Sequence, residues 1–220
     1  MNAEVTVGGE NLELCPERAI YWRRRRMLLV ADPHFGKATA FRALGINVPR
    51  GTTAEGLLRL DGLLHARDVD TLVFLGDFLH AREGRSDATF VALAEWRASH
   101  GDVAMQIVRG NHDRRAGDPP EMVGIECVDG PLMVMPFALA HHPVAIPGSY
   151  VLAGHLHPCA TLVGVGRQRE RLPCFWFSAG VGVLPAFGDF TGCAEVPAGG
   201  DDTVWVVADD SVMQAARHES

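Results

Sequence analysis

Five short apolar segments each end in polar residues, and this pattern constrains the fold more than any other feature of the sequence. The segments are Met27–Ala31, Thr71–Leu75, Val103–Val108, Phe137–Ala140 and Tyr150–Ala153. Short, nearly continuous apolar runs are typical of strands buried on both faces of a sheet. Because ligands gather at the carboxyl ends of strands in open α/β sheets, we expect the polar residues that follow these segments to meet in one place.

The polar residues behind the five segments form a series of short motifs. They are Asp32-Pro33-His34, Gly76-Asp77, Gly110-Asn111-His112-Asp113, His141-His142 and Gly154-His155-Leu156-His157. In the last motif, both imidazoles lie on the same side of an extended segment, as chelation of a metal ion requires. A lone Asp-x-His or Gly-Asp is common in turns, but all five motifs in this order, each behind an apolar strand, are hard to obtain by chance.

The donor types predict a site for two metal ions. Carboxylate, imidazole and amide oxygen, without any thiolate, suit Mn²⁺, Fe or Zn²⁺. Seven ligands are too many for one tetrahedral ion but fit two ions, roughly 3.5–4 Å apart, that share a bridging carboxylate. We expect two divalent ions, Mn²⁺ in the first place and Fe, Zn or Ni as alternatives. The predicted ligands are Asp32, His34, Asp77, Asn111, His141, His155 and His157.

The remaining sequence predicts an α/β (α+β) fold with two sheets. Thr52–Arg67 has leucines at helical spacing behind a start that resembles a capping box, and Asp87–Ser99 reads as a second helix. Further strands are expected at Val123–Val128, Leu132–Met135, Thr161–Val165, Cys174–Phe177 and Thr203–Ala208. An α/β first half and a β-rich second half favour two sheets packed face to face with helices outside. Without a visible linker or repeat, we expect one domain over residues 1–220.

The cysteine pattern, the N-terminus and the hydropathy predict a cytoplasmic protein without a membrane span. The five cysteines are scattered without a CxxC spacing, which favours reduced thiols over a disulfide framework. The N-terminus lacks a basic start followed by an apolar run, so no signal peptide is expected. The longest apolar stretch, Leu132–Ala140, is interrupted by Pro136 and is far too short to span a membrane.

The series of motifs resembles the calcineurin-like metallophosphoesterase family over residues 28–157. Flanking segments are similar to a bacterial subfamily, the ligase-associated DNA-damage-response endonucleases, over nearly the whole chain. These segments are Phe35-Gly36-Lys37, Val48-Pro49-Arg50-Gly51-Thr52-Thr53, Gly76-Asp77-Phe78-Leu79-His80, Leu172–Phe177 and Leu184–Gly188. The resemblance implies the four-layer architecture of that family, a two-sheet sandwich flanked by helices.

The resemblance also implies a role for each motif residue. Asp32, His34 and His157 would bind one ion, Asn111, His141 and His155 the other, and Asp77 would bridge them. His112 would touch the phosphate and protonate the leaving oxygen, and Asp113 would orient His112. The expected reaction is attack on phosphorus by a hydroxide that bridges the metals, to which a placed acid–base group typically adds ~10²–10⁴-fold in rate.

Several basic residues have two open interpretations. His80 takes a place where many relatives carry Asp, so it could lie beside the substrate. Arg50 and Arg114 lie in or near motif loops and could bind phosphate, although a solvated surface role is equally plausible. The run Arg23–Arg26 could contact a nucleic-acid backbone, but an exposed turn is the more common explanation.

The leading functional hypothesis is a phosphoesterase acting on phosphodiesters. The resemblance implies DNA as the substrate and an association with a DNA ligase or helicase in repair. The net charge of −7 favours a small nucleotide instead, as substrate of a phosphodiesterase or phosphomonoesterase. A third hypothesis, a binding module that has lost catalysis, predicts missing ligands, and none is missing. The sequence leaves endo- or exo-cleavage, the native metal and the oligomeric state open.

Overall fold

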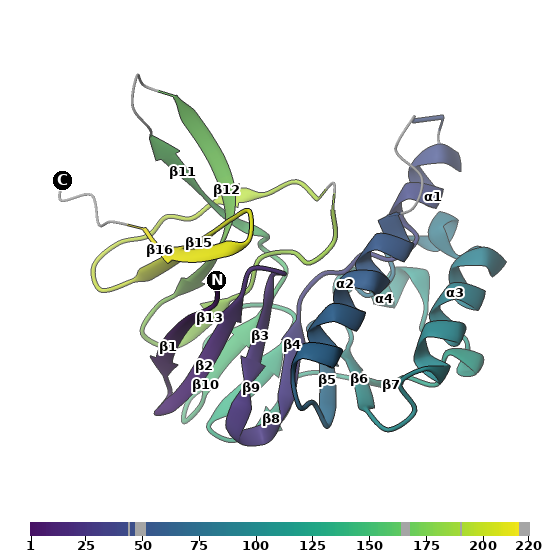
Figure 1. The fold of residues 1–220 in the computed structure, drawn as a ribbon, viewed down its shortest axis with the longest axis horizontal. Helices are drawn as coiled ribbons and strands as arrows, with labels where there is room; N and C mark the ends of the chain where they lie inside the picture. Colours follow the sequence, from purple (N-terminus) through teal and green to yellow (C-terminus); the bar gives the residue numbers. More distant parts are fainter. Residues whose placement is uncertain (44, 47–51, 164–167, 190, 216–220) are drawn as a thin grey trace.

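Two β-sheets pack face to face in the computed structural model, which describes residues 1–43, 45–46, 52–163, 168–189 and 191–215 (Figure 1). Helices lie beside the first sheet, at the right of the view. The two-sheet α/β class expected from the sequence is therefore confirmed. No helix among the described residues is long and apolar enough to cross a membrane.

The first sheet follows the order of the chain. Its seven strands in the described residues are β1 (Ala3–Val7), β2 (Glu10–Cys15), β3 (Ala19–Trp22), β4 (Met27–Val30), β5 (Thr71–Phe74), β6 (Ala104–Val108) and β7 (Glu126–Val128). The strands β1 to β4 are antiparallel, whereas β4 to β7 are parallel. Because β4, β5 and β6 run in the same direction, the polar residues that follow them emerge at one edge of the sheet.

The second sheet is mixed. Its nine strands in the described residues are β8 (Leu132–Val134), β9 (Phe137–Ala140), β10 (Tyr150–Ala153), β11 (Pro158–Val163), β12 (Arg169–Phe177), β13 (Val181–Val183), β14 (Ala194–Glu195), β15 (Thr203–Ala208) and β16 (Ser211–Gln214). The strands β9, β10 and β13 are parallel, and antiparallel pairs surround them. The last two of the five predicted strands, β9 and β10, are thus parallel neighbours.

Four α-helices and three short 3₁₀ turns connect the strands in the described residues. They are α1 (Lys37–Ala43), α2 (Thr52–Ala66), α3 (Asp87–Ala98), α4 (Asn111–Ala116), η1 (Arg23–Arg25), η2 (Arg82–Gly84) and η3 (Glu121–Val123). The sequence predicts α2 and α3, each with an end displaced by one residue. The helix α3 begins after Ser86, whose hydroxyl accepts the Thr89 N–H at 3.2 Å, a stabilising N-cap.

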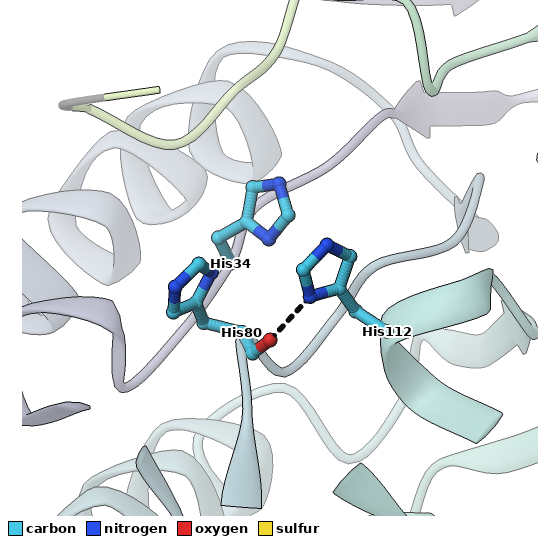
Figure 2. A group of neighbouring side chains, drawn as sticks. All are labelled: His34, His80 and His112. Atoms are coloured by element: carbon cyan, nitrogen blue, oxygen red, sulfur yellow. Dashed lines mark hydrogen bonds between the residues drawn. The ribbon is translucent and has the colours of Figure 1, made fainter. Parts of the chain in front are cut away.

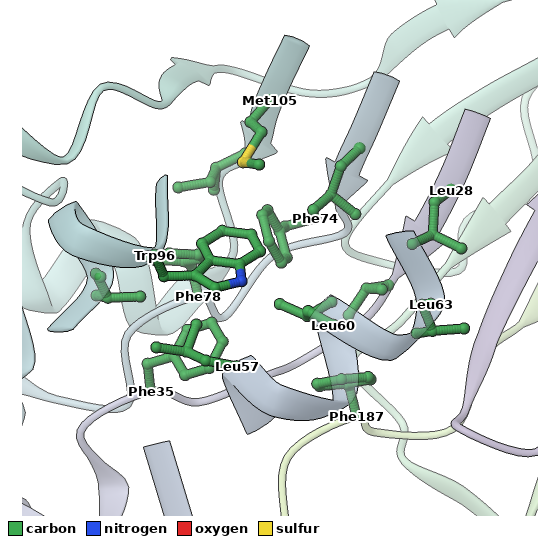
Figure 3. Close-up of a cluster of buried hydrophobic side chains, with 14 of the residues drawn as sticks. Leu28, Phe35, Leu57, Leu60, Leu63, Phe74, Phe78, Trp96, Met105 and Phe187 are labelled. Carbon is green, nitrogen blue, oxygen red and sulfur yellow. The ribbon is translucent and has the colours of Figure 1, made fainter. Parts of the chain in front are cut away.

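Apolar packing holds the layers together. The buried face of α2, with Leu57, Leu60 and Leu63, packs with Trp96 of α3 against the outer face of the first sheet (Figure 3). A second cluster fills the space between the sheets, where Trp22 meets Phe137 edge to face with ring centroids 4.9 Å apart. A small third cluster lies on the outer face of the second sheet, where Ile146, rather than a helix, packs over Ala138 and Val151.

The arginine run Arg23–Arg26 forms the turn between β3 and β4. Arg23 pairs with Glu13 and Arg24 with Glu10, while Arg26 pairs with Asp68 and Asp70. Three of its four guanidinium groups therefore already have carboxylate partners. These pairs favour the exposed-turn interpretation over a nucleic-acid contact.

Candidate metal centre

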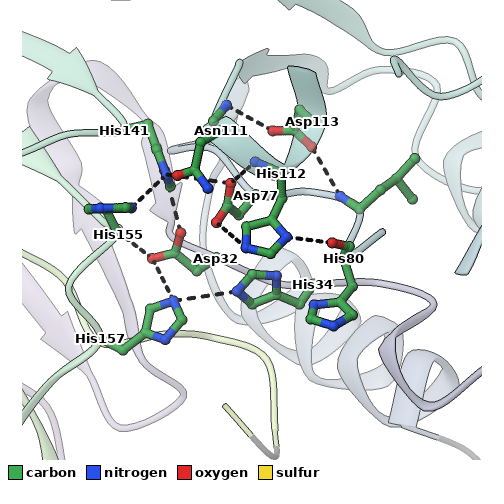
Figure 4. A network of polar contacts seen from close by, with 12 residues as sticks. Asp32, His34, Asp77, His80, Asn111, His112, Asp113, His141, His155 and His157 are labelled. Atoms are coloured by element: carbon green, nitrogen blue, oxygen red, sulfur yellow. Dashed lines mark hydrogen bonds and ion pairs between the residues drawn. The ribbon is translucent and has the colours of Figure 1, made fainter. Parts of the chain in front are cut away.

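The polar residues behind the five parallel strands meet at the carboxyl ends of both sheets (Figure 4). The first sheet contributes the residues after β4, β5 and β6, and the second sheet contributes those after β9 and β10. All seven ligands predicted from the sequence lie in this cluster: Asp32, His34, Asp77, Asn111, His141, His155 and His157. Their positions agree with the expectation, while their roles as ligands stay predictions.

One half of the cluster contains Asp32, His34 and His157, whose donor atoms all lie within 4.8 Å of one another. The two imidazole Nε2 atoms are 3.4 Å apart, and His157 Nε2 is 3.6 Å from Asp32 Oδ2. The Nδ1 of His157 donates to the carbonyl of Gly192 at 3.0 Å. In the neutral ring this contact leaves the Nε2 lone pair facing the cluster, as metal ligation requires.

The other half contains Asn111, His141 and His155. The His141 Nε2 is 2.9 Å from Asn111 Oδ1, 3.1 Å from His155 Nδ1 and 3.4 Å from Asp77 Oδ1. Because His141 Nδ1 donates to the Leu75 carbonyl at 3.1 Å, its Nε2 carries a lone pair in the neutral ring. Two acceptors, this nitrogen and the amide oxygen, therefore face each other at hydrogen-bond distance. A shared cation would remove that repulsion.

Two buried carboxylates lie between the halves. Asp32 is fully buried and Asp77 nearly so. Asp32 Oδ2 accepts the His155 N–H at 2.7 Å, but Oδ1 is buried without a hydrogen-bond partner in the described residues. Burial, together with the neighbouring charge of Asp77, raises the pKa of Asp32 well above its usual range. A cation between the carboxylates would compensate both effects.

The histidines are held in the form that binds metals. Burial is the main cause that lowers the pKa of His34, His155 and His157, and it lowers the pKa of His141 to about 4. Neutral imidazole is the ligating form, so these rings need not lose a proton near neutral pH. Neutral imidazoles, an unpartnered carboxylate oxygen and facing acceptors together fit two divalent cations.

Most of the candidate ligands have an unusual backbone conformation. Five of the eight non-glycine residues with positive φ in the described chain are candidate ligands: Asp32, His34, Asp77, His155 and His157, with φ between 47° and 72°. The left-handed conformation is unfavourable for residues with a side chain, by roughly 1–2 kcal/mol each. Such strain concentrates at functional sites.

The predicted acid–base residue His112 also faces the cluster. Its Nδ1 donates to the carbonyl of His80 at 2.5 Å, and its Nε2 lies 3.9 Å from Asp77 Oδ2 (Figure 4). The resemblance implies that Asp113 orients His112, but the Asp113 carboxylate accepts the backbone N–H groups of Gly110 at 2.9 Å and Leu79 at 3.1 Å. In the structure, the His80 carbonyl fixes the ring of His112, while Asp113 ties together the loops that carry both residues. A contact through a backbone carbonyl has no signature in the sequence.

The three candidate substrate residues differ in position. The His80 ring stacks on His112 with centroids 5.4 Å apart and lies 5.3 Å from His34, so the structure brings it to the site (Figure 2). Its Nδ1 is buried without a hydrogen-bond partner in the described residues, and burial lowers its pKa to about 4. Arg114 instead is exposed and pairs with Asp129 at 3.1 Å. Arg50 lies outside the described residues.

The fold and donor set define a class of protein: a two-sheet α/β sandwich with a candidate two-metal centre at the strand ends. No family model and no curated protein matches the sequence. Among solved structures, the chain is similar to the crystal structure of the Pseudomonas putida nuclease MPE, with 42% sequence identity and a TM-score of 0.87. The match covers 98% of this chain and 100% of that chain. The protein therefore belongs to the same family as this nuclease. The narrower resemblance to ligase-associated endonucleases stays a prediction.

Proposed function

We propose that the protein is a phosphodiesterase that uses two divalent metal ions, Mn²⁺ in the first place, to cleave DNA. The observation that carries the proposal is the convergence of seven nitrogen and oxygen donors, in two adjacent groups, around a pair of buried carboxylates. The relationship to a protein described as a nuclease supports the substrate class.

The candidate ligands and His112 would have different roles in the proposed hydrolysis. Asp32, His34 and His157 would hold one ion and Asn111, His141 and His155 the other, with Asp77 between them. Metal ions bound there would supply Lewis acidity and an activated water nucleophile. Because the His80 carbonyl fixes Nδ1–H of His112, its Nε2 is the nitrogen that can give a proton to the leaving oxygen or hold positive charge near the phosphate.

The first experiment compares metal content with turnover. We expect about two metal ions per chain, and hydrolysis of bis(p-nitrophenyl) phosphate that Asp77→Asn abolishes together with part of the metal. Asp209→Asn is the matched control, because Asp209 has nearly the same φ, 48° against 47°, and lies in the turn between β15 and β16. Two metals without turnover on any phosphodiester would refute the proposed activity, and failure to bind any metal would refute the site.

A second assay separates DNA from small substrates. A small-nucleotide phosphodiesterase is favoured by the net charge of −7, which opposes binding to nucleic acid through bulk charge. Cleavage of DNA whose efficiency falls steeply with salt would support phosphate-backbone contacts. Efficient turnover of small nucleotides, with DNA left intact, would favour the alternative. A role beside a DNA ligase or helicase in repair is supported by the sequence resemblance alone.

A further inference from the structure

Lys37 is the only lysine in the chain, whose other basic side chains, histidines aside, are all arginines. It begins α1, directly after the loop that carries Asp32 and His34, and its backbone N–H donates to the His34 carbonyl at 3.1 Å. The backbone of Lys37 therefore lies next to the candidate metal centre.

The side chain of Lys37 lies on the His34 side of the centre. It is half-buried, and Nζ is 5.5 Å from the centroid of the Phe41 ring, which in turn meets the His80 ring edge to face at 5.5 Å. After burial, the positive charge of Lys37 is the largest cause that lowers the pKa of His34 and of His80. The same charge also lowers the pKa of His157. The contacts from Lys37 to Phe41, from Phe41 to His80 and from His80 to His34, whose ring centroids are 5.3 Å apart, place the ammonium group beside this half of the site.

The ammonium group has no counter-charge among the described residues. Burial lowers the pKa of Lys37, and no carboxylate in the described part of the chain offsets the effect. Arginines near the centre differ, because Arg109 pairs with Asp118 at 2.7 Å and Arg114 pairs with Asp129 at 3.1 Å. A partly buried cation without a partner is unfavourable, and an anion bound beside it would remove that penalty.

We propose that the Lys37 ammonium binds a non-bridging oxygen of the substrate phosphate on the His34–His80 side of the metal centre. The inference rests on the proposed function and names a residue that binds its substrate. Lysine suits this place because its compact ammonium group acts as a point charge on phosphate.

The single lysine permits a direct binding experiment. Reductive methylation with ¹³C-formaldehyde keeps the positive charge and labels two amines, Lys37 and the N-terminal Met1. In the Zn²⁺-loaded protein, inorganic phosphate should shift the Lys37 methyl resonances and leave those of Met1 unchanged, at constant ionic strength set with chloride. Equal shifts of both resonances, or no shift at Lys37 under saturating phosphate, would overturn the proposal.

Kinetics provide the second readout. Lys37→Met should raise the KM for bis(p-nitrophenyl) phosphate roughly tenfold or more, as loss of a charge-assisted hydrogen bond predicts, with unchanged metal content and a smaller change in kcat. Lys37→Arg should restore part of the loss. The control Arg24→Gln removes a positive charge at the opposite end of β4, where Arg24 pairs with Glu10, and should leave KM unchanged.

The outcomes separate this proposal from the proposed function. An unchanged KM in Lys37→Met, or a loss of bound metal in that variant, would refute a role in phosphate binding. If the unmodified protein hydrolyses no phosphodiester, the proposed function fails, whereas the phosphate-dependent shift of the Lys37 resonance still decides whether the anion site exists.

Discussion

Replacing Gly110 by alanine should displace Asp77 in the candidate metal centre and lower turnover without unfolding the protein. Gly110 has φ −88°, a backbone conformation that alanine adopts freely. The substitution therefore tests steric contact and adds no backbone strain. A Cβ at this position would lie 2.2 Å from Asp77 Oδ1 and 2.5 Å from the Asp77 backbone nitrogen. The added methyl group therefore collides with the carboxylate predicted to bridge the two ions.

The size of the effect follows from these contacts. Carbon–oxygen contacts in proteins are about 3.3 Å or longer, so the carboxylate of Asp77 must move by roughly 1 Å. The backbone at Asp77 must shift as well, because its nitrogen also lies too close to the added Cβ. Overpacking of this kind destabilises a protein by about 1–3 kcal/mol, which a typical domain survives. A displacement of about 1 Å at a catalytic group can lower turnover by on the order of 10²-fold.

The assay measures bound metal, hydrolysis of bis(p-nitrophenyl) phosphate and urea denaturation for Gly110→Ala beside Gly62→Ala. Gly62 lies in α2 with open space around its Cβ position, so the control should keep metal and activity and gain about 0.5–1 kcal/mol of stability. A Gly110→Ala protein with two metals per chain and undiminished turnover would refute the placement of Asp77 in the centre.

Three further predictions concern stability. Burial lowers the pKa of His141 to about 4 in the metal-free fold, so its neutral ring contributes stability above pH 6.5 that is lost as the pH falls toward about 4. The free energy of unfolding of the metal-free protein, measured relative to His141→Gln, should drop over that range, and a constant difference would contradict the argument. Asp113→Ala leaves two backbone N–H groups without an acceptor and should lower the free energy of unfolding by roughly 2–4 kcal/mol in urea titrations, more than Asp113→Asn does. Leu60→Ala opens a cavity in the fully buried core under α2 and should lower stability by about 2–5 kcal/mol while metal content per folded chain stays constant; a smaller loss of stability than Leu58→Ala, at an exposed position of the same helix, would contradict the assigned core face.

The elements that position the site could be predicted because they are buried on both sides. A parallel strand covered on both faces reads as a continuous apolar run, and β4, β5 and β6 follow that pattern to within one residue at each end. The helices α2 and α3 carry apolar residues at helical spacing, and both begin at the residue that the sequence indicates. In these segments, local pattern and tertiary environment point to the same structure.

Other elements escaped prediction for physical reasons. The strands β1 and β2 are partly exposed and contain several charged residues, so they lack a continuous apolar run. The helix α4, Asn-His-Asp-Arg-Arg-Ala, has almost no apolar face. Its first turn is fixed by tertiary contacts, since Asp113 accepts N–H groups from both its own loop and Leu79. Such contacts leave no periodic signal.

The donor set of the candidate centre was recognisable from the sequence, whereas the contacts that orient it were not. Each donor is a side chain in a short motif behind a strand, so the chemical type and the order of the donors can be read from the sequence. The carbonyl groups of Leu75, His80 and Gly192 orient His141, His112 and His157, respectively. Any residue type carries a carbonyl group, so only the fold reveals which ones are used. The proposed role of Lys37 could not be predicted either, because it is inferred from the absence of a carboxylate partner among the described residues.

The backbone at the ligands gives an argument for function that does not depend on resemblance. Asp32, Asp77 and His157 have φ near +50°, where glycine would be free of strain, and Gly76 beside Asp77 has φ +81°. If the chain needed only the turn, glycine would serve at each of these positions and would relieve roughly 1–2 kcal/mol of strain. These positions instead carry a carboxylate or an imidazole, and each of these side chains points into the same cluster. Asp32 accepts the His155 N–H and Asp77 accepts the His112 N–H, but Asp32 Oδ1 is buried without a hydrogen-bond partner in the described residues. The strain at these positions therefore supports a ligand bound between the side chains.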